Sequence, residues 1–211
     1  MLLIIIGGLG FPVAQDIIEM IYLIFVKKYS VKFSIGRLKL QSKIALTTTI
    51  LLIIGGAFAI FVFEFNNYKT IGNMNLFGKV LASFFQSVTL RTAGFSSIDQ
   101  GSMNYASKLI SSVLMFVGGS PTGTAGGAKT VTMAILFFAV LSLIKGIDEI
   151  NAYNRTIGFD MLQKALSVVI MMLTVIVIAV IILSLTEANL LVANGGKFEL
   201  LDIFYETVSA I

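Results

Sequence analysis

Two stretches of the chain, residues 44–63 and 165–185, are mostly apolar and contain no charged residue. Each has about twenty residues, the length that an α-helix needs to cross a hydrocarbon core of roughly 30 Å. A water-soluble domain of this size would have to bury both stretches completely, which few small domains can do. The pattern therefore predicts two membrane-spanning helices.

Two further apolar segments are interrupted by glycine and proline. Leu2–Val26 is broken at Gly7–Pro12, and a segment from about residue 105 to 145 is broken at Gly118–Gly127. Such residues kink or end a helix, and within a membrane they are tolerated where surrounding protein satisfies the freed backbone groups. We therefore expect two broken membrane helices.

Residues Leu76–Leu90 are too few to cross a membrane, and the polar sequence Arg91–Ser97 follows them. This profile is typical of a re-entrant element, which is allowed where protein or a water-filled cavity surrounds it. Residues 198–211 predict another short helix of this kind. The expected fold is therefore an all-α integral membrane protein.

The composition agrees with a membrane protein and excludes several classes of function. The chain is 57% hydrophobic and 12% charged, and it contains neither cysteine nor histidine. Thiolate and imidazole metal sites and His- or Cys-based catalysis are thereby excluded, and few acids lie within the apolar segments, so we expect no enzyme and no cofactor. The net charge is +4, and much of it falls between the first two spans, in a stretch without acids. These cations are Lys27, Lys28, Lys32, Arg37, Lys39 and Lys43. Such clustering is typical of a cytoplasmic loop under the positive-inside rule, not of nucleic-acid binding.

An internal repeat organises the chain. Phe84–Thr89 matches Phe204–Ser209 at an offset of 120 residues, and the same offset superimposes the two uninterrupted spans. Fixed-period similarity constrains the whole architecture. It predicts three parts: residues 1–43, the second helix of one repeat with a cytoplasmic loop; 44–150, a complete helix–pore loop–helix repeat; and 151–211, the beginning of the next. We expect the chain to be a piece of a longer protein.

The turn Thr92-Ala93-Gly94-Phe95 follows the short helix of the complete repeat. Cation filters replace the hydration shell with backbone carbonyls, which requires an extended turn and a residue tolerant of unusual φ and ψ. A helix whose C-terminus points at the ion would add a favourable dipole. This turn is our candidate ion filter, and one such turn supplies only a quarter of a four-fold site.

Longer motifs resemble one family. Ser87–Phe95 is similar to the third pore loop of the Trk/Ktr/HKT potassium transporters, Gly118–Thr130 to the second helix of that repeat, and Gly7–Pro12 to the second helix of the preceding repeat. The resemblance covers nearly the whole chain. It implies four linked repeats around one pore, in a multi-pass protein of the plasma membrane that takes up potassium.

The resemblance also implies site residues and partners. Thr92, Ala93 and Gly94, beside Phe95, would offer carbonyls to potassium. A gating loop would obstruct the pore beneath them, and its residues would be Gly118, Gly119, Ser120, Thr122, Gly123, Thr124, Gly126, Gly127 and Lys129. The family implies a homodimer in membrane lipid, resting on a cytoplasmic ring of nucleotide-binding regulatory subunits. Sodium as a coupling or activating ion is left open.

Several alternatives remain at this point. A secondary transporter with re-entrant hairpins and a midplane site has a similar profile, although its repeats are often inverted. The sequence of Gly123–Thr130 nearly matches the motif of a phosphate-binding loop, but no strand is expected before it. Arg91 would repel potassium unless neutralised, so we expect it to face outward, paired with Asp99 or Glu206.

Overall fold

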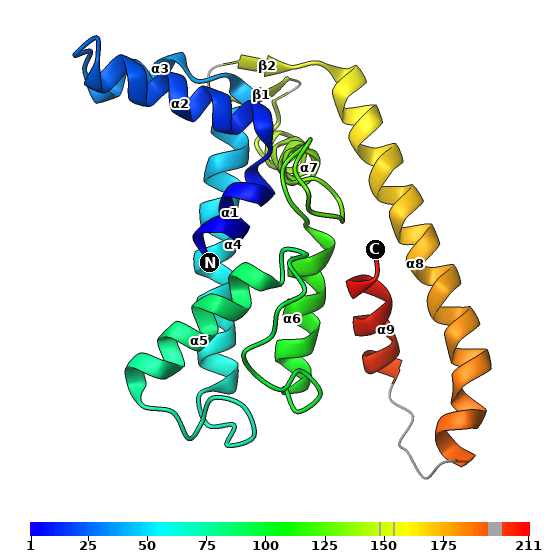
Figure 1. Cartoon of the computed structure of the whole chain (residues 1–211). Helices are drawn as coiled ribbons and strands as arrows, with labels where there is room; N and C mark the ends of the chain where they lie inside the picture. Colours follow the sequence, from blue (N-terminus) through cyan, green and yellow to red (C-terminus); the bar gives the residue numbers. More distant parts are fainter. Residues whose placement is uncertain (148, 154, 194–199) are drawn as a thin grey trace.

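The computed structural model describes residues 1–147, 149–153, 155–193 and 200–211 (Figure 1). Helices account for most of this part of the chain. They are α1 Leu2–Leu9, α2 Phe11–Phe25, α3 Val31–Arg37, α4 Leu40–Glu64, α5 Leu76–Thr89, α6 Tyr105–Phe116, α7 Thr130–Ile144, α8 Phe159–Ala193 and α9 Leu200–Ser209. The two strands are β1 Ile150–Ala152 and β2 Arg155–Ile157.

Among the described residues, two single helices are long and apolar enough to cross a membrane. They are Leu40–Glu64 and the Phe159–Thr186 part of α8, and α8 runs along one outer side of the molecule in Figure 1. Both predicted spans are therefore confirmed. Each helix extends beyond its uncharged stretch, because polar residues at the ends continue the backbone hydrogen bonding without entering the apolar layer.

Helices α1 and α2 form the predicted broken segment, with a bend of 107° between them. Gly10 lies at the break with φ +76°, and proline occupies the first turn of α2, where its missing N–H costs no hydrogen bond. The bend turns α2 and α3 across one end of α4 (Figure 1).

Helices α6, α7 and α9 lie between the two long ones, and α5 crosses α4 (Figure 1). Asn75 caps the start of α5, and its side chain accepts a hydrogen bond from the Gly78 N–H at 2.8 Å. Helices α6 and α7 are separated by residues 117–129 and run in different directions (Figure 1). The second broken helix is thus confirmed. The described part of the last short helix begins at Leu200, and residues 198–199 of its predicted range lie outside the described residues.

Apolar side chains from four helices, with Leu90 just after α5, form the core beside these short helices. The cluster contains Ile60, Leu90, Leu114, Met115, Ile176, Tyr205 and Val208. It holds the ends of α5 and α9 against α6. The packing therefore fixes the ends of α5 and α9, the two helices that are related by the 120-residue repeat.

An antiparallel hairpin interrupts the otherwise helical architecture. Strands β1 and β2 pair Ile150 with Ile157 and Ala152 with Arg155. Ala152 and Ile157 are buried in a cluster with Ile44 and Ala165. The sequence predicted only a mixed-charge loop here, because strands of three residues are too short to show a hydrophobic alternation.

Candidate functional site

The candidate filter turn is held by a side chain of the helix that precedes it. Thr89 Oγ1 accepts a hydrogen bond from the Phe95 N–H at 3.0 Å and donates to the Phe95 carbonyl at 2.6 Å. The Ala93 N–H donates to the Thr89 carbonyl at 3.0 Å. Thr89 was not predicted as a site residue, although it lies within the motif that suggested the filter.

Backbone strain gathers in this turn. Gly94 has φ +77°, and Thr92 has φ +65°, a conformation that β-branched residues rarely adopt. Strained residues of this kind persist where surrounding bonds fix them, often at functional sites. Here the Thr92 hydroxyl accepts a hydrogen bond from the Gly126 N–H at 3.0 Å.

A cavity of about 270 Å³ lies beside the turn. Its lining residues are Thr89, Leu90, Thr92, Gly94, Phe95, Gln100, Met115 and Ser209. Three of the four predicted filter residues line it, whereas Ala93 does not. Thr89 and Ser209 are repeat-related, 209 − 89 = 120 residues apart, and they are the last residues of α5 and α9. The C-terminal ends of two repeat-related short helices therefore meet at one cavity.

The predicted gating loop lies against both the filter turn and the break between α1 and α2. The Ser120 and Thr124 N–H groups donate to the carbonyls of Gly8 at 2.8 Å and Gly7 at 3.4 Å. Towards the turn, the Gly126 N–H reaches Thr92, as described above. These backbone bonds place the loop between two segments that lie far away in the sequence.

Further bonds shape the loop itself. The Ala128 N–H donates to the Phe116 carbonyl at 2.8 Å, and the Thr130 N–H to the Gly119 carbonyl at 2.9 Å. Thr122 and Gly127 have positive φ angles of 62° and 69°. A Cβ atom at Gly118 would overlap the Gly126 carbonyl oxygen. Small residues are therefore required where the loop folds back on itself.

Arg91 differs from its prediction. It is buried, and its Nη2 donates to the Gly118 carbonyl at 3.1 Å. Within the described residues, the ion pairs are Lys39–Asp16 and Lys108–Asp202, so pairing of Arg91 with Asp99 or Glu206 is not observed. The side chain points to the loop because burial beside α6 leaves a backbone carbonyl as its acceptor.

Lys129 is bound locally. Its Nζ donates to the Ala125 carbonyl at 2.6 Å, within its own loop. The segment preceding the loop is helix α6, not a strand. The context that a phosphate-binding loop requires is thus absent at Gly123–Thr130.

Gly10 leaves no room for a side chain. A Cβ atom there would lie 2.7 Å from the Pro121 carbonyl oxygen and 2.9 Å from the Gly123 N, and φ is +76°. We expect Gly10→Ala to push the loop off the break and to destabilise the fold by about 1–3 kcal/mol. Thermal unfolding of the purified protein, followed by far-ultraviolet circular dichroism, measures this loss.

Gly8→Ala is the matched control for that substitution. A Cβ atom at Gly8 meets nothing within 4 Å, and the residue is helical. Its unfolding temperature should stay at or slightly above that of the natural sequence, since alanine favours helices. Equal stability of the two variants would contradict close packing of the loop on Gly10.

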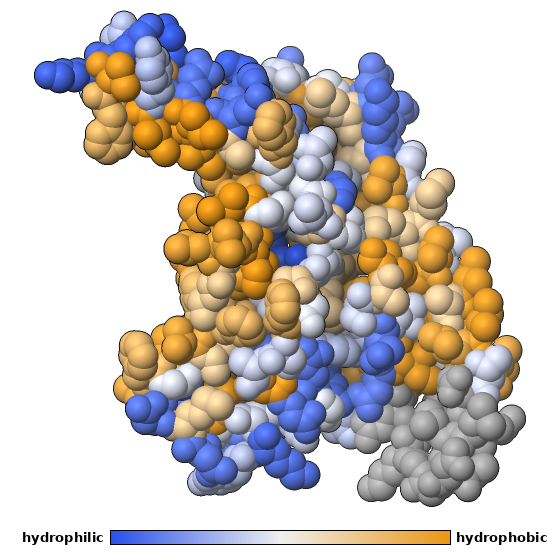
Figure 2. Space-filling model, viewed as in Figure 1, coloured by the Kyte–Doolittle hydropathy of each residue, from blue (hydrophilic) through white to orange (hydrophobic). Residues whose placement is uncertain are grey.

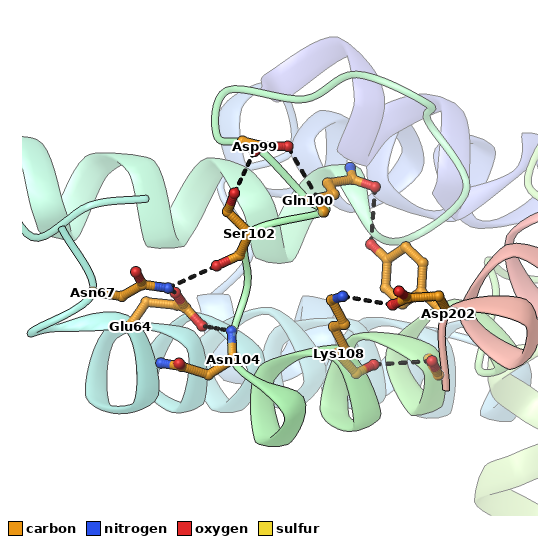
Figure 3. Close-up of polar contacts among 11 residues, drawn as sticks. Glu64, Asn67, Asp99, Gln100, Ser102, Asn104, Lys108 and Asp202 are labelled. Atoms are coloured by element: carbon orange, nitrogen blue, oxygen red, sulfur yellow. Dashed lines mark hydrogen bonds and ion pairs between the residues drawn. The ribbon is translucent and has the colours of Figure 1, made fainter. Parts of the chain in front are cut away.

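A polar network organises the opposite end of the site (Figure 3). The fully buried Glu64 carboxylate accepts hydrogen bonds from Asn67 Nδ2 at 2.7 Å, Thr70 Oγ1 at 2.6 Å and the Asn104 N–H at 2.9 Å. Asn104 precedes α6, so Glu64 joins the end of α4 to the start of α6. Sequence analysis missed this role, because Glu64 is simply the first polar residue after an apolar span.

A second set of polar contacts ties α9 to α6, through Lys108, and to the segment after the candidate filter turn, through Gln100 (Figure 3). Lys108 Nζ lies 2.5 Å from Asp202 Oδ1, and the Tyr205 hydroxyl donates to Gln100 Oε1 at 3.0 Å. In the loop, hydrogen bonds from Ser102 Oγ and the Gly101 N–H hold the pKa of Asp99 below its usual value. The contacts of Lys108 and Gln100 fix α9 beside the cavity, against α6 and against the loop that follows the candidate filter turn.

Comparisons with known proteins agree with this architecture. Residues 1–211 match the TrkH family, described as a cation transport protein. The potassium/sodium uptake protein NtpJ of Enterococcus hirae is 38% identical over 185 residues, which cover 88% of this chain and 38% of that protein. The Ktr system potassium uptake protein B of Bacillus subtilis is 32% identical over 208 residues, 99% of this chain and 42% of that protein. The chain thus spans about two fifths of the length of these relatives, and it belongs to the TrkH family of cation transport proteins.

Proposed function

We propose that this membrane-embedded, multi-pass chain forms part of the pore of a potassium uptake transporter. The observation that carries the proposal is the meeting of α5 and α9 at one cavity. Their last residues, Thr89 and Ser209, are 120 positions apart in a sequence with a 120-residue repeat, and both line that cavity. Repeats arranged around a central space are what a pore requires.

The electrostatics of the cavity favour a cation. Each helix C-terminus carries roughly half a negative elementary charge, and here two such ends face the same space. The residues that line the cavity carry no ionisable side chain. Partial charges from helices and carbonyls attract a potassium ion without binding it as tightly as a carboxylate would, which suits conduction. In this proposal, the carbonyls of Thr92, Ala93 and Gly94 replace part of the hydration shell.

We also propose that residues 118–129 obstruct the pore until they move. The loop bonds to Thr92 of the filter turn and to Arg91 just before it, and on its other side it bonds to Gly7 and Gly8. Most of its bonds to other segments are single backbone hydrogen bonds, each with a modest net free energy of about 1 kcal/mol. A gate of this kind opens when a few such bonds break together.

Complete function requires the parts of the relatives that this chain does not span. We propose that the whole transporter is a homodimer that binds a cytoplasmic ring of nucleotide-binding subunits. The β1–β2 hairpin suits such docking, because Asn151, Tyr153 and Arg155 are exposed at the same end of the bundle as α3. Co-purification of the complete transporter from mild detergent would report both partners.

Transport by the complete gene tests the proposal. We expect it to restore growth at low potassium in a bacterium that lacks its own uptake systems, and to let purified protein in liposomes accumulate rubidium, a potassium analogue. External potassium should inhibit rubidium entry more strongly than sodium does. Failure of rubidium entry in folded, correctly inserted protein would contradict the proposal and favour a transporter for another substrate.

A further inference from the structure

Helices α2 and α3 form an arm, residues 11–37, across one end of the bundle (Figure 1). A buried carboxylate fixes the arm to α4: Asp16 accepts a hydrogen bond from Ser42 Oγ at 2.6 Å and pairs with Lys39 Nζ at 3.1 Å. Because α4 spans the membrane, an arm that crosses its end lies along the membrane surface.

The arm has an apolar face that other described segments leave uncovered. Phe11, Ile18, Tyr22 and Phe25 recur at helical spacing along α2 and are 69%, 66%, 50% and 76% exposed. Figure 2 shows apolar surface on the side of the arm towards the spans and hydrophilic surface on its outer side. This division is that of an interfacial helix, whose apolar face enters the boundary between headgroups and acyl chains.

Cations gather at the tip of the same arm. Lys27, Lys28 and Lys32 are exposed, and in the described part of the chain none of them has a carboxylate within ion-pair distance. The neighbouring cations are engaged: Lys43 Nζ donates to the Gly36 carbonyl at 2.9 Å, and Arg37 lies 4.9 Å from the centre of the Phe33 ring. Three positive charges therefore stand free beside an apolar face at the membrane boundary.

We propose that this arm binds anionic phospholipids, with the three lysines on headgroup phosphates and the α2 stripe among the upper acyl segments. The positive-inside rule places these lipids in the cytoplasmic leaflet. A soluble acidic partner would meet the hydrophilic outer side and leave the apolar side unexplained. The proposal rests on membrane embedding and is independent of potassium conduction.

Lipid retention tests the charges. The complete transporter, purified from membranes containing phosphatidylglycerol and phosphatidylcholine, is washed and its bound lipids are counted by mass spectrometry. Each lysine near an anionic surface contributes about a fivefold preference, so the triple variant Lys27→Gln, Lys28→Gln, Lys32→Gln should lose at least tenfold in phosphatidylglycerol retention. The control Lys145→Gln, Lys164→Gln removes two exposed cations from the same end, off the arm and outside the proposed docking hairpin. Equal retention in the two variants would overturn the proposal.

A probe tests the apolar face separately. The chain has no cysteine, so Phe25→Cys provides a single labelling position within it. A bimane dye there should be quenched by lipids brominated near the headgroup and not by aqueous iodide. Quenching by iodide would show that the face is open to soluble partners, and protection from both quenchers would show that other parts of the protein cover it. Either result would overturn the proposal.

Discussion

Replacing Gly94 by serine is expected to impair potassium-limited growth and to make the remaining growth sensitive to sodium. Gly94 has φ +77°, which costs a non-glycine residue about 1–2 kcal/mol. A Cβ atom there meets nothing within 4 Å, so the substitution changes the turn without a steric clash in the core. Since 1.4 kcal/mol is a factor of ten in an equilibrium, potassium preference over sodium should fall about tenfold.

The measurement is rubidium uptake into cells under sodium competition, at expression levels matched by immunoblot. Gly101→Ala is the control, because it lies in the same loop, has no positive φ, and would place its Cβ in ordinary contact, 3.5 Å from Asp99 Oδ1. It should transport like the natural sequence. Unimpaired selectivity in Gly94→Ser would remove this turn from the ion-selecting machinery.

Local pattern and the repeat predicted most of the architecture from sequence. Charge-free stretches of about twenty residues have few alternatives to spanning a membrane, and α4 and α8 contain both of them. The break at Gly7–Pro12 was visible for a comparable reason, since glycine and proline act on the backbone wherever they stand. The hairpin Ile150–Ile157 escaped prediction because its order comes from packing on Ile44 and Ala165, residues outside its own sequence.

The site residues also divide into those that local sequence predicts and those that tertiary contacts determine. Thr92 and Gly94 could be predicted as candidates because a filter turn needs particular residue types, and both line the cavity beside the turn. The acceptor of Arg91 was not predicted, because electrostatic reasoning considered only carboxylates, and the structure offers a backbone carbonyl from the loop. Glu64 was missed because three neutral donors converge on it, two from the loop that follows it and one from the start of α6 forty residues away. Tertiary convergence of this sort leaves no trace in the spacing of a single segment.

Replacing Arg91 by methionine is expected to increase potassium flux through an unstimulated transporter. Arg91 donates to Gly118, so the residue preceding the filter turn holds one end of the proposed gate. A hydrogen bond from a charged group contributes about 1.5–3 kcal/mol, and losing it should raise the population of open gates roughly tenfold or more. Methionine keeps most of the volume and removes an isolated buried charge, so the fold should survive.

Two further variants, Thr92→Val and Arg91→Lys, separate the effect of hydrogen bonds to the loop from the effect of the positive charge of Arg91. Thr92→Val keeps the shape of the side chain and leaves Arg91 charged, yet it removes the acceptor of the Gly126 N–H, so it should also raise unstimulated flux. Arg91→Lys retains the positive charge beside the cavity. If repulsion of potassium were the only role of Arg91, Lys would transport normally and Thr92→Val would have no effect. We expect increased flux in both Arg91→Met and Thr92→Val, with rubidium still preferred over sodium. This result means that hydrogen bonds from the filter turn and from Arg91 keep the loop in its obstructing position.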